Sequence, residues 1–79
     1  MITEDQFTIF KDAMVSYKDR LPPEELLTFL GEISVQICSE PKTTFRERLR
    51  MQSIIFDVIA DVNEQLRIRD NMRKPTLAL

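Results

Sequence analysis

The stretch FRERLRMQSIIFDVIADVNEQLRIRD, residues 45–70, decides the fold of this chain. Apolar residues recur in it at spacings of three and four, which is typical of one face of a long helix. A second row, containing small and apolar residues, recurs at i, i+4, i+7 and i+11 on the far side of the same helix. A helix that is apolar on two faces must be covered on two faces. The main row consists of Met51, Ile55, Val58, Val62 and Leu66, and the second row, which we name the outer seam, consists of Leu49, Ser53, Phe56 and Ala60.

Two further helices precede the long one. Residues 3–6 and 44–47 both match the capping-box pattern, so helices are expected to begin just after Thr3 and Thr44. The pair Pro22-Pro23 ends the first helix and starts the second, because proline suits the first helical turn and resists continuation from upstream. The sequence therefore predicts helices over about residues 4–20, 23–38 and 45–71, the last of them about 40 Å long.

The expected fold is all-α, a three-helix antiparallel arrangement in which the second and third helices form a hairpin and the first helix packs across it. Residues 1–74 are expected to form one domain, and residues 75–79 a C-terminal tail. Two arrangements would cover the long helix: the first two helices each cover one face, or a second copy covers the outer seam. We favour the homodimer, because a single core below about 70–80 residues rarely supplies more than about 3–5 kcal/mol of net stability.

The composition excludes several classes of function. The 79 residues include one glycine, one cysteine and no histidine. One glycine cannot build a phosphate-binding loop, and without histidine the commonest general base and metal ligand are missing. No apolar run approaches the roughly 18 residues of a membrane span. We therefore expect a cytoplasmic protein that is not an enzyme, binds no cofactor or metal, and does not enter a membrane.

Two single residues carry minor expectations. Gly31 is the only glycine and lies inside the second helix, where it is expected to let a neighbouring helix come close; a hinge is the alternative. Cys38 is expected to be a small, partly buried residue near the end of that helix. Its free thiol is in keeping with a reducing cytoplasm.

The charge is divided between the two halves of the chain. Residues 1–40 hold three basic and eight acidic side chains, whereas residues 41–79 hold eight basic and five acidic ones. Cations at the start of the third helix oppose the helix dipole, so local stability does not explain them. They either bind an anion together with the free N–H groups of the helix N-terminus, or pair with the acidic half of the chain. The candidate anion-binding residues are Lys42, Thr44, Arg46, Arg48 and Arg50.

These patterns favour a non-enzymatic protein-interaction module: a homodimeric regulator, inhibitor or adaptor that binds another protein through apolar helix surface. The outer seam is the expected partner or dimer interface. The alternative function is an anion-binding module that contacts a nucleic-acid backbone or a nucleotide. An acidic pI of about 5.0 weighs against nucleic-acid binding. The make-up is similar to that of small all-helical accessory proteins of phages, plasmids and bacteria, a class that usually acts by binding another protein.

Overall fold

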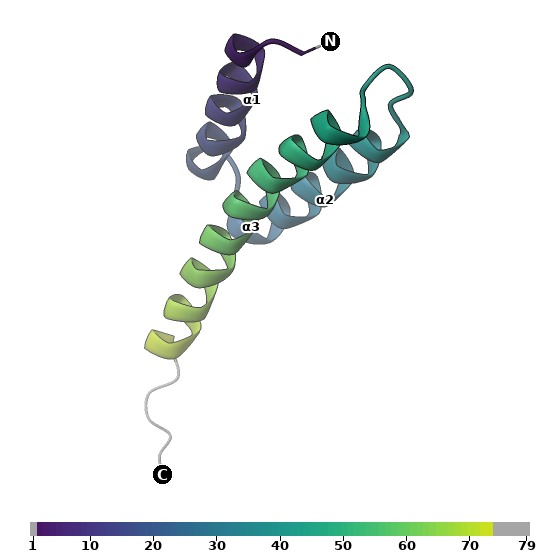
Figure 1. The fold of residues 1–79 in the computed structure, drawn as a ribbon. Helices are drawn as coiled ribbons and strands as arrows, with labels where there is room; N and C mark the ends of the chain where they lie inside the picture. Colours follow the sequence, from purple (N-terminus) through teal and green to yellow (C-terminus); the bar gives the residue numbers. More distant parts are fainter. Residues whose placement is uncertain (1, 74–79) are drawn as a thin grey trace.

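The computed structural model describes residues 2–73, and it forms three α-helices with one short 3-10 turn (Figure 1). The all-α prediction is confirmed, and the described residues contain no strand. The predicted tail, residues 75–79, lies outside the described residues. The elements are α1 (Glu4–Ser16), η1 (Tyr17–Asp19), α2 (Pro23–Ser39) and α3 (Phe45–Arg73).

Local sequence signals set the ends of these helices. Thr3 caps α1 through the predicted capping box, in which its side chain accepts a hydrogen bond from the Gln6 N–H. The α-helix ends at Ser16 rather than near residue 20, and the chain tightens into the 3-10 turn η1. The N–H groups of Arg20 and Leu21 both donate to the Tyr17 carbonyl, which closes the turn before the two prolines.

α2 lies along α3 and contacts it from Gln52 to Arg69. Glu24, in the first turn of α2, pairs with Arg69 near the end of α3 at 2.7 Å. At the other end of α2, the Gln52 side chain of α3 donates hydrogen bonds to the Ser34 carbonyl at 2.9 Å and to the Cys38 sulfur at 3.1 Å. The start of α2 therefore lies beside the C-terminal part of α3, and the end of α2 lies beside its beginning.

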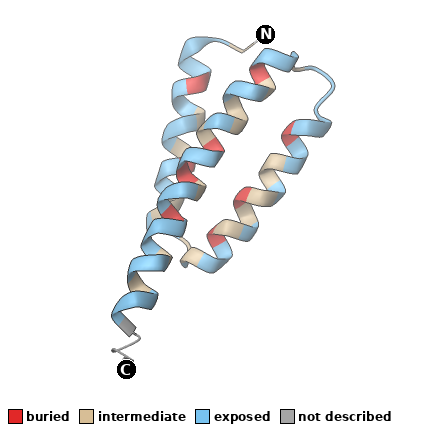
Figure 2. Cartoon of the chain, turned by 60° about the horizontal axis from the view of Figure 1, so that its bottom comes forward, coloured by how far each residue is buried: buried red, intermediate tan, exposed pale blue. Residues whose placement is uncertain are grey.

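The core is small and lies where the three helices meet. Leu26 and Leu30 of α2 pack with Ile55 and Val62 of α3, and all four side chains are almost completely inaccessible to solvent. Met14 of α1 joins this cluster. Figure 2 shows that the buried positions of α3 lie in its first two-thirds and that its C-terminal end is exposed. Each buried leucine, isoleucine or valine contributes roughly 1.5–3 kcal/mol relative to exposure.

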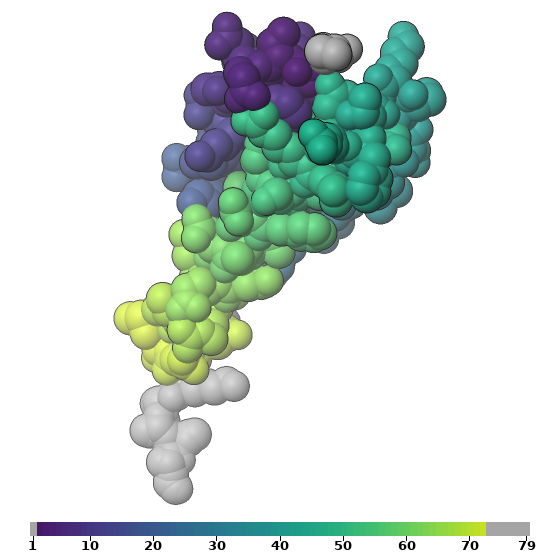
Figure 3. Space-filling model, in the orientation of Figure 1, coloured from purple at the N-terminus to yellow at the C-terminus, as the bar shows by residue number. Residues whose placement is uncertain are grey.

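The three helices do not close into a compact bundle. α1 and α2 diverge from the turn that joins them, and α3 runs past both (Figures 1 and 3). The molecule measures 55 × 20 × 17 Å. α3, with 29 residues, is about 43 Å long, whereas α2 has 17 residues. α3 is therefore much longer than α2, and part of α3 has no neighbour among the described residues.

Candidate interaction surface

All four residues of the outer seam are exposed. Leu49 retains 54% and Phe56 57% of its accessible surface, and the small residues Ser53 and Ala60 lie between and beyond them. Phe45, four residues before Leu49, extends the row and is 68% exposed. The alternative in which α1 and α2 cover both faces of α3 is therefore wrong. On the face shown in Figure 3, α3 (green to yellow) is not covered by the other two helices along its length.

Helix α1 lies on the other side of the α2–α3 pair. The Tyr17 ring meets the Phe29 ring of α2 edge-on at 4.8 Å between centroids. The Lys18 ammonium pairs with the Asp61 carboxylate of α3 at 3.0 Å. Asp61 and Phe29 thus mark the side of each helix that α1 approaches, and the outer seam lies on the side that α1 leaves open.

The open side of the pair includes residues of α2. Ser34 and Cys38 mark this side, because both contact Gln52 of α3. Gly31 shares their side of α2, since it precedes them by three and seven residues. Phe56 follows Gln52 by one turn and is therefore level with Gly31 along the two helices. We name this surface the hairpin face, and it consists of Gly31, Ser34 and Cys38 from α2 and Phe45, Leu49, Ser53, Phe56 and Ala60 from α3.

Two expectations about the hairpin face are wrong. No helix comes close at Gly31: a methyl group added there would have no atom within 4 Å. The turn after α1 carries that helix to the opposite side of α2, and so it does not reach Gly31. Cys38 is exposed rather than partly buried, because its neighbour on α3 is the polar Gln52 side chain and not an apolar one.

Glu47 ties the N-terminal segment to the start of α3. Its carboxylate accepts hydrogen bonds from the N–H of Thr44 at 2.9 Å and from the N–H of Ile2 at 2.6 Å. The Thr44 hydroxyl accepts from the Glu47 N–H, which completes the predicted capping box. The Ile2 and Thr44 N–H groups hold the pKa of this carboxyl, on a buried residue, below its ordinary value. The box was readable from the sequence, but the contact with Ile2, 45 residues away, was not.

The predicted anion-binding residues are mostly engaged within the chain. Arg50 forms a two-pronged ion pair with Glu4 of α1, at 2.5 and 2.6 Å, and this pair lowers the pKa of Glu4. Arg50 also lies over the Phe7 ring, with its guanidinium carbon 4.2 Å from the centroid. Arg48 donates to the carbonyls of Glu40 and Thr43 at 3.1 and 3.3 Å, which stabilises the loop between α2 and α3.

Lys42 and Arg46 are the remaining cations of the cluster. Both are exposed, and neither side chain forms an ion pair within residues 2–73. Two N–H groups at the start of α3, those of Thr44 and Glu47, are engaged by the Glu47 and Thr44 side chains, which leaves fewer donors for an anion. Three of the ion pairs, Lys18–Asp61, Arg50–Glu4 and Arg69–Glu24, join a residue of the acidic half of the chain (residues 1–40) to a residue of the basic half.

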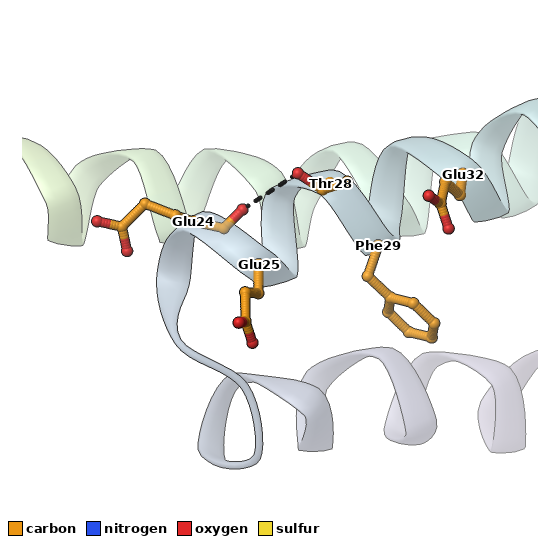
Figure 4. Close-up of a pocket in the computed structure, with 5 residues that line it drawn as sticks. All are labelled: Glu24, Glu25, Thr28, Phe29 and Glu32. Carbon is orange, nitrogen blue, oxygen red and sulfur yellow. Dashed lines mark hydrogen bonds between the residues drawn. The ribbon is translucent and has the colours of Figure 1, made fainter.

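Three other surface features are less well suited to a ligand. Figure 4 shows a shallow pocket on α2 in which the carboxylates of Glu24, Glu25 and Glu32 lie well apart along the helix. An apolar groove runs between α1 and Met51 of α3, and it is lined by Ile9 and Phe10. Near its end, α3 exposes Ile68 and Met72 beside Gln65. Among residues 2–73, no group of three or more acidic or cysteine side chains is placed to hold a metal ion.

The part of the chain that the structure describes contains no helix with the length and apolar character needed to cross a bilayer. Comparisons of the chain with protein-family models, with curated proteins and with solved structures give no significant match. The surface that the helices leave open is therefore the candidate functional site.

Proposed function

We propose that this chain is a non-enzymatic protein-interaction module that works as a homodimeric, antiparallel helical bundle in the cytoplasm. It acts as a regulator, inhibitor or adaptor by binding another protein. One observation carries this proposal: Phe45, Leu49 and Phe56 lie in a row on α3, each more than half exposed, on the side that α1 does not cover. Contiguous apolar surface rimmed by polar residues is typical of interaction sites.

The size of the hydrophobic term supports pairing. Covering the exposed half of a large apolar side chain removes about 100 Å² of apolar surface, about 2.5 kcal/mol at about 25 cal/mol per Å². A symmetric dimer covers three such side chains from each copy, which gives roughly 15 kcal/mol before costs. Association costs about 4–15 kcal/mol in lost freedom of motion. The gain is large enough for a specific dimer and too small for an irreversible one.

The test is the mass of the chain in solution. Light scattering after size exclusion should give twice the 9.3 kDa mass of one chain at micromolar concentrations. Phe56→Glu should shift the protein to the monomer and leave its helix content unchanged, because Phe56 is exposed in the single chain. The matched control is Ile9→Glu on α1, which is 67% exposed and lies away from the hairpin face. A wild-type monomer at all concentrations would contradict the proposal.

The second candidate function is recognition of an acidic surface, such as a nucleic-acid backbone, at Lys42 and Arg46. The observation in its favour is that both cations are exposed and form no ion pair within residues 2–73. Its test is a titration with duplex DNA across a range of salt concentrations, because backbone contacts weaken steeply as salt rises. Binding that persists in the double variant Lys42→Glu/Arg46→Glu, or no binding at low salt, would reject it.

A further inference from the structure

Gly31 of α2 and Phe56 of α3 lie at the same position along the long axis of the hairpin. The Gln52 side chain contacts Ser34, and this contact sets the position of α2 along α3. Gly31 precedes Ser34 by about one turn of α2, and Phe56 follows Gln52 by about one turn of α3. Both steps lead the same way along the molecule, because the end of α2 lies beside the beginning of α3. A bare patch of backbone on one helix is therefore level with a large exposed ring on the other helix.

The bare patch at Gly31 is unused within the chain. A methyl group added at Gly31 meets no atom within 4 Å, so the ring of the neighbouring Phe56 does not cover it. Phe56 retains 57% of its accessible surface. Glycine inside a helix costs about 1 kcal/mol relative to alanine, and nothing in the single chain compensates for that cost. The single chain thus has both a ring and a recess, each without a partner.

We propose that a second copy of this chain covers the hairpin face, with α2 of each copy packed on α3 of its partner and the Phe56 ring seated on Gly31 of the partner subunit. This inference rests on the homodimer of the proposed function and specifies its geometry. A two-fold axis parallel to the hairpin does not change the position of any residue along that axis. Phe56 of one copy therefore comes opposite the partner's Gly31. Symmetry repeats the contact, so each dimer contains it twice.

The ring and the recess select this arrangement over the other symmetric one. A two-fold axis across the hairpin would stack α2 on α2 and α3 on α3, so the Phe56 ring would not meet the recess at Gly31. The axis along the hairpin instead opposes α2 with α3.

Small residues beside the outer seam fit the same arrangement. Ser53 and Ala60 flank Phe56 on α3, one turn away on either side, and both are exposed. Short side chains let two helices approach closely enough for a ring to reach the opposite backbone. The apolar groove on α1 lacks such a recess, because a methionine and two phenylalanines line it.

Disulfide crosslinking of mixed variants tests this geometry directly. All chains carry Cys38→Ser, which removes the exposed native thiol. One chain carries Gly31→Cys and the other carries Phe56→Cys, with tags of different mass. After mixing and mild oxidation, the crosslinked species expected is the one with both tags. A disulfide needs the two Cα atoms within about 7 Å, so it reports close contact only.

Each variant oxidised alone is the matched control. The proposed arrangement places the two Gly31 positions, and the two Phe56 positions, diagonally across the bundle, so neither variant should crosslink with itself. Self-crosslinking of either variant would show like helices stacked on each other and overturn the proposal. A dimer by mass that yields no crosslink in the mixture would also overturn it, while leaving the proposed function intact. A monomer by mass would reject both.

A second variant tests the recess without new thiols. Gly31→Leu should raise the dissociation constant of the dimer at least tenfold, because the side chain fills the place of the partner's ring. The control is Thr8→Leu, an exposed position on α1 that does not line the surface around Gly31. It should leave dimerisation within about twofold of the wild type. Equal effects of the two variants, or none from Gly31→Leu, would contradict the seating of Phe56 on Gly31.

Discussion

The substitution Gly31→Ala should strengthen the single chain and weaken the dimer. In the chain, the added methyl group has no atom within 4 Å, and the backbone at Gly31 is not in the left-handed region that favours glycine. In the proposed dimer, the same methyl group stands between the helix backbone and the ring from the partner. A single methyl group therefore acts with opposite sign on the two equilibria.

The expected magnitudes follow from these surroundings. Alanine is about 0.8–1 kcal/mol more favourable than glycine in a helix interior, and no clash reduces this gain. For a domain of this size the gain corresponds to a rise in Tm of about 4–8 °C. Extra methyl groups in a packed contact cost about 1–3 kcal/mol each. Two symmetric contacts therefore cost the dimer about 2–6 kcal/mol, which raises its dissociation constant about 30-fold or more.

The assay separates the two effects by concentration. Urea unfolding followed by circular dichroism, in samples dilute enough to be monomeric, reports the stability of the chain. Sedimentation equilibrium over a wide concentration range reports dimerisation. The reasoning is refuted if Gly31→Ala dimerises as tightly as the wild type, because Gly31 would then face solvent in the dimer. A loss of chain stability in dilute samples would show that the space beside Gly31 is filled within the monomer.

Three further predictions concern the chain itself. Leu30→Ala should lower the free energy of unfolding by about 2–5 kcal/mol in a urea titration, because Leu30 is fully buried, whereas Val35→Ala, at an exposed site on the same helix, should change it by less than about 0.5 kcal/mol. Glu47→Gln should make the stability of the chain less sensitive to acid in a series of thermal melts from pH 7 to pH 3. The folded-state pKa of Glu47 is lowered, so its contribution to stability is complete above the ordinary value of 4.5. That contribution is lost as the pH falls through the folded-state pKa. Thr44→Ala should cost about 1 kcal/mol by removing the cap of α3, and an unchanged urea midpoint would contradict the capping role.

The helices could be predicted because their signals are local. Capping boxes at Thr3 and Thr44 and the two prolines before α2 act within a few residues, and the predicted ends of α2 and α3 agree with the structure within about two residues. The end of α1 was predicted about four residues too far along. A 3-10 turn and an α-helical turn share the same side-chain pattern, so the sequence alone does not separate them.

The outer seam could also be predicted from the sequence, because a helix with apolar residues on two sides needs a contact on each of them. What the sequence did not contain was the path of α1. Its position depends on contacts between distant residues, such as Arg50 with Glu4 and Ile2 with Glu47. Periodicity within one helix carries no information about such pairs. For the same reason the surroundings of Gly31 were predicted wrongly.

The basic cluster at the start of α3 shows the same limit. The sequence left open whether these cations bind a ligand or pair with the acidic half of the chain. Within residues 2–73 the structure pairs Arg50 with Glu4 and directs Arg48 to backbone carbonyls. Half of the cluster thus has a structural role, and Lys42 and Arg46 are left for a ligand.

The most direct test of the central claim is an isotope-filtered NMR experiment on a dimer mixed from labelled and unlabelled chains. It detects only contacts between protons of different copies that lie within about 5 Å of each other. Our account predicts contacts from the Phe56 ring protons of one copy to the Hα protons of the partner's Gly31. Contacts from the Phe56 ring to the partner's Phe56, or a dimer with no contact to Gly31, would contradict it.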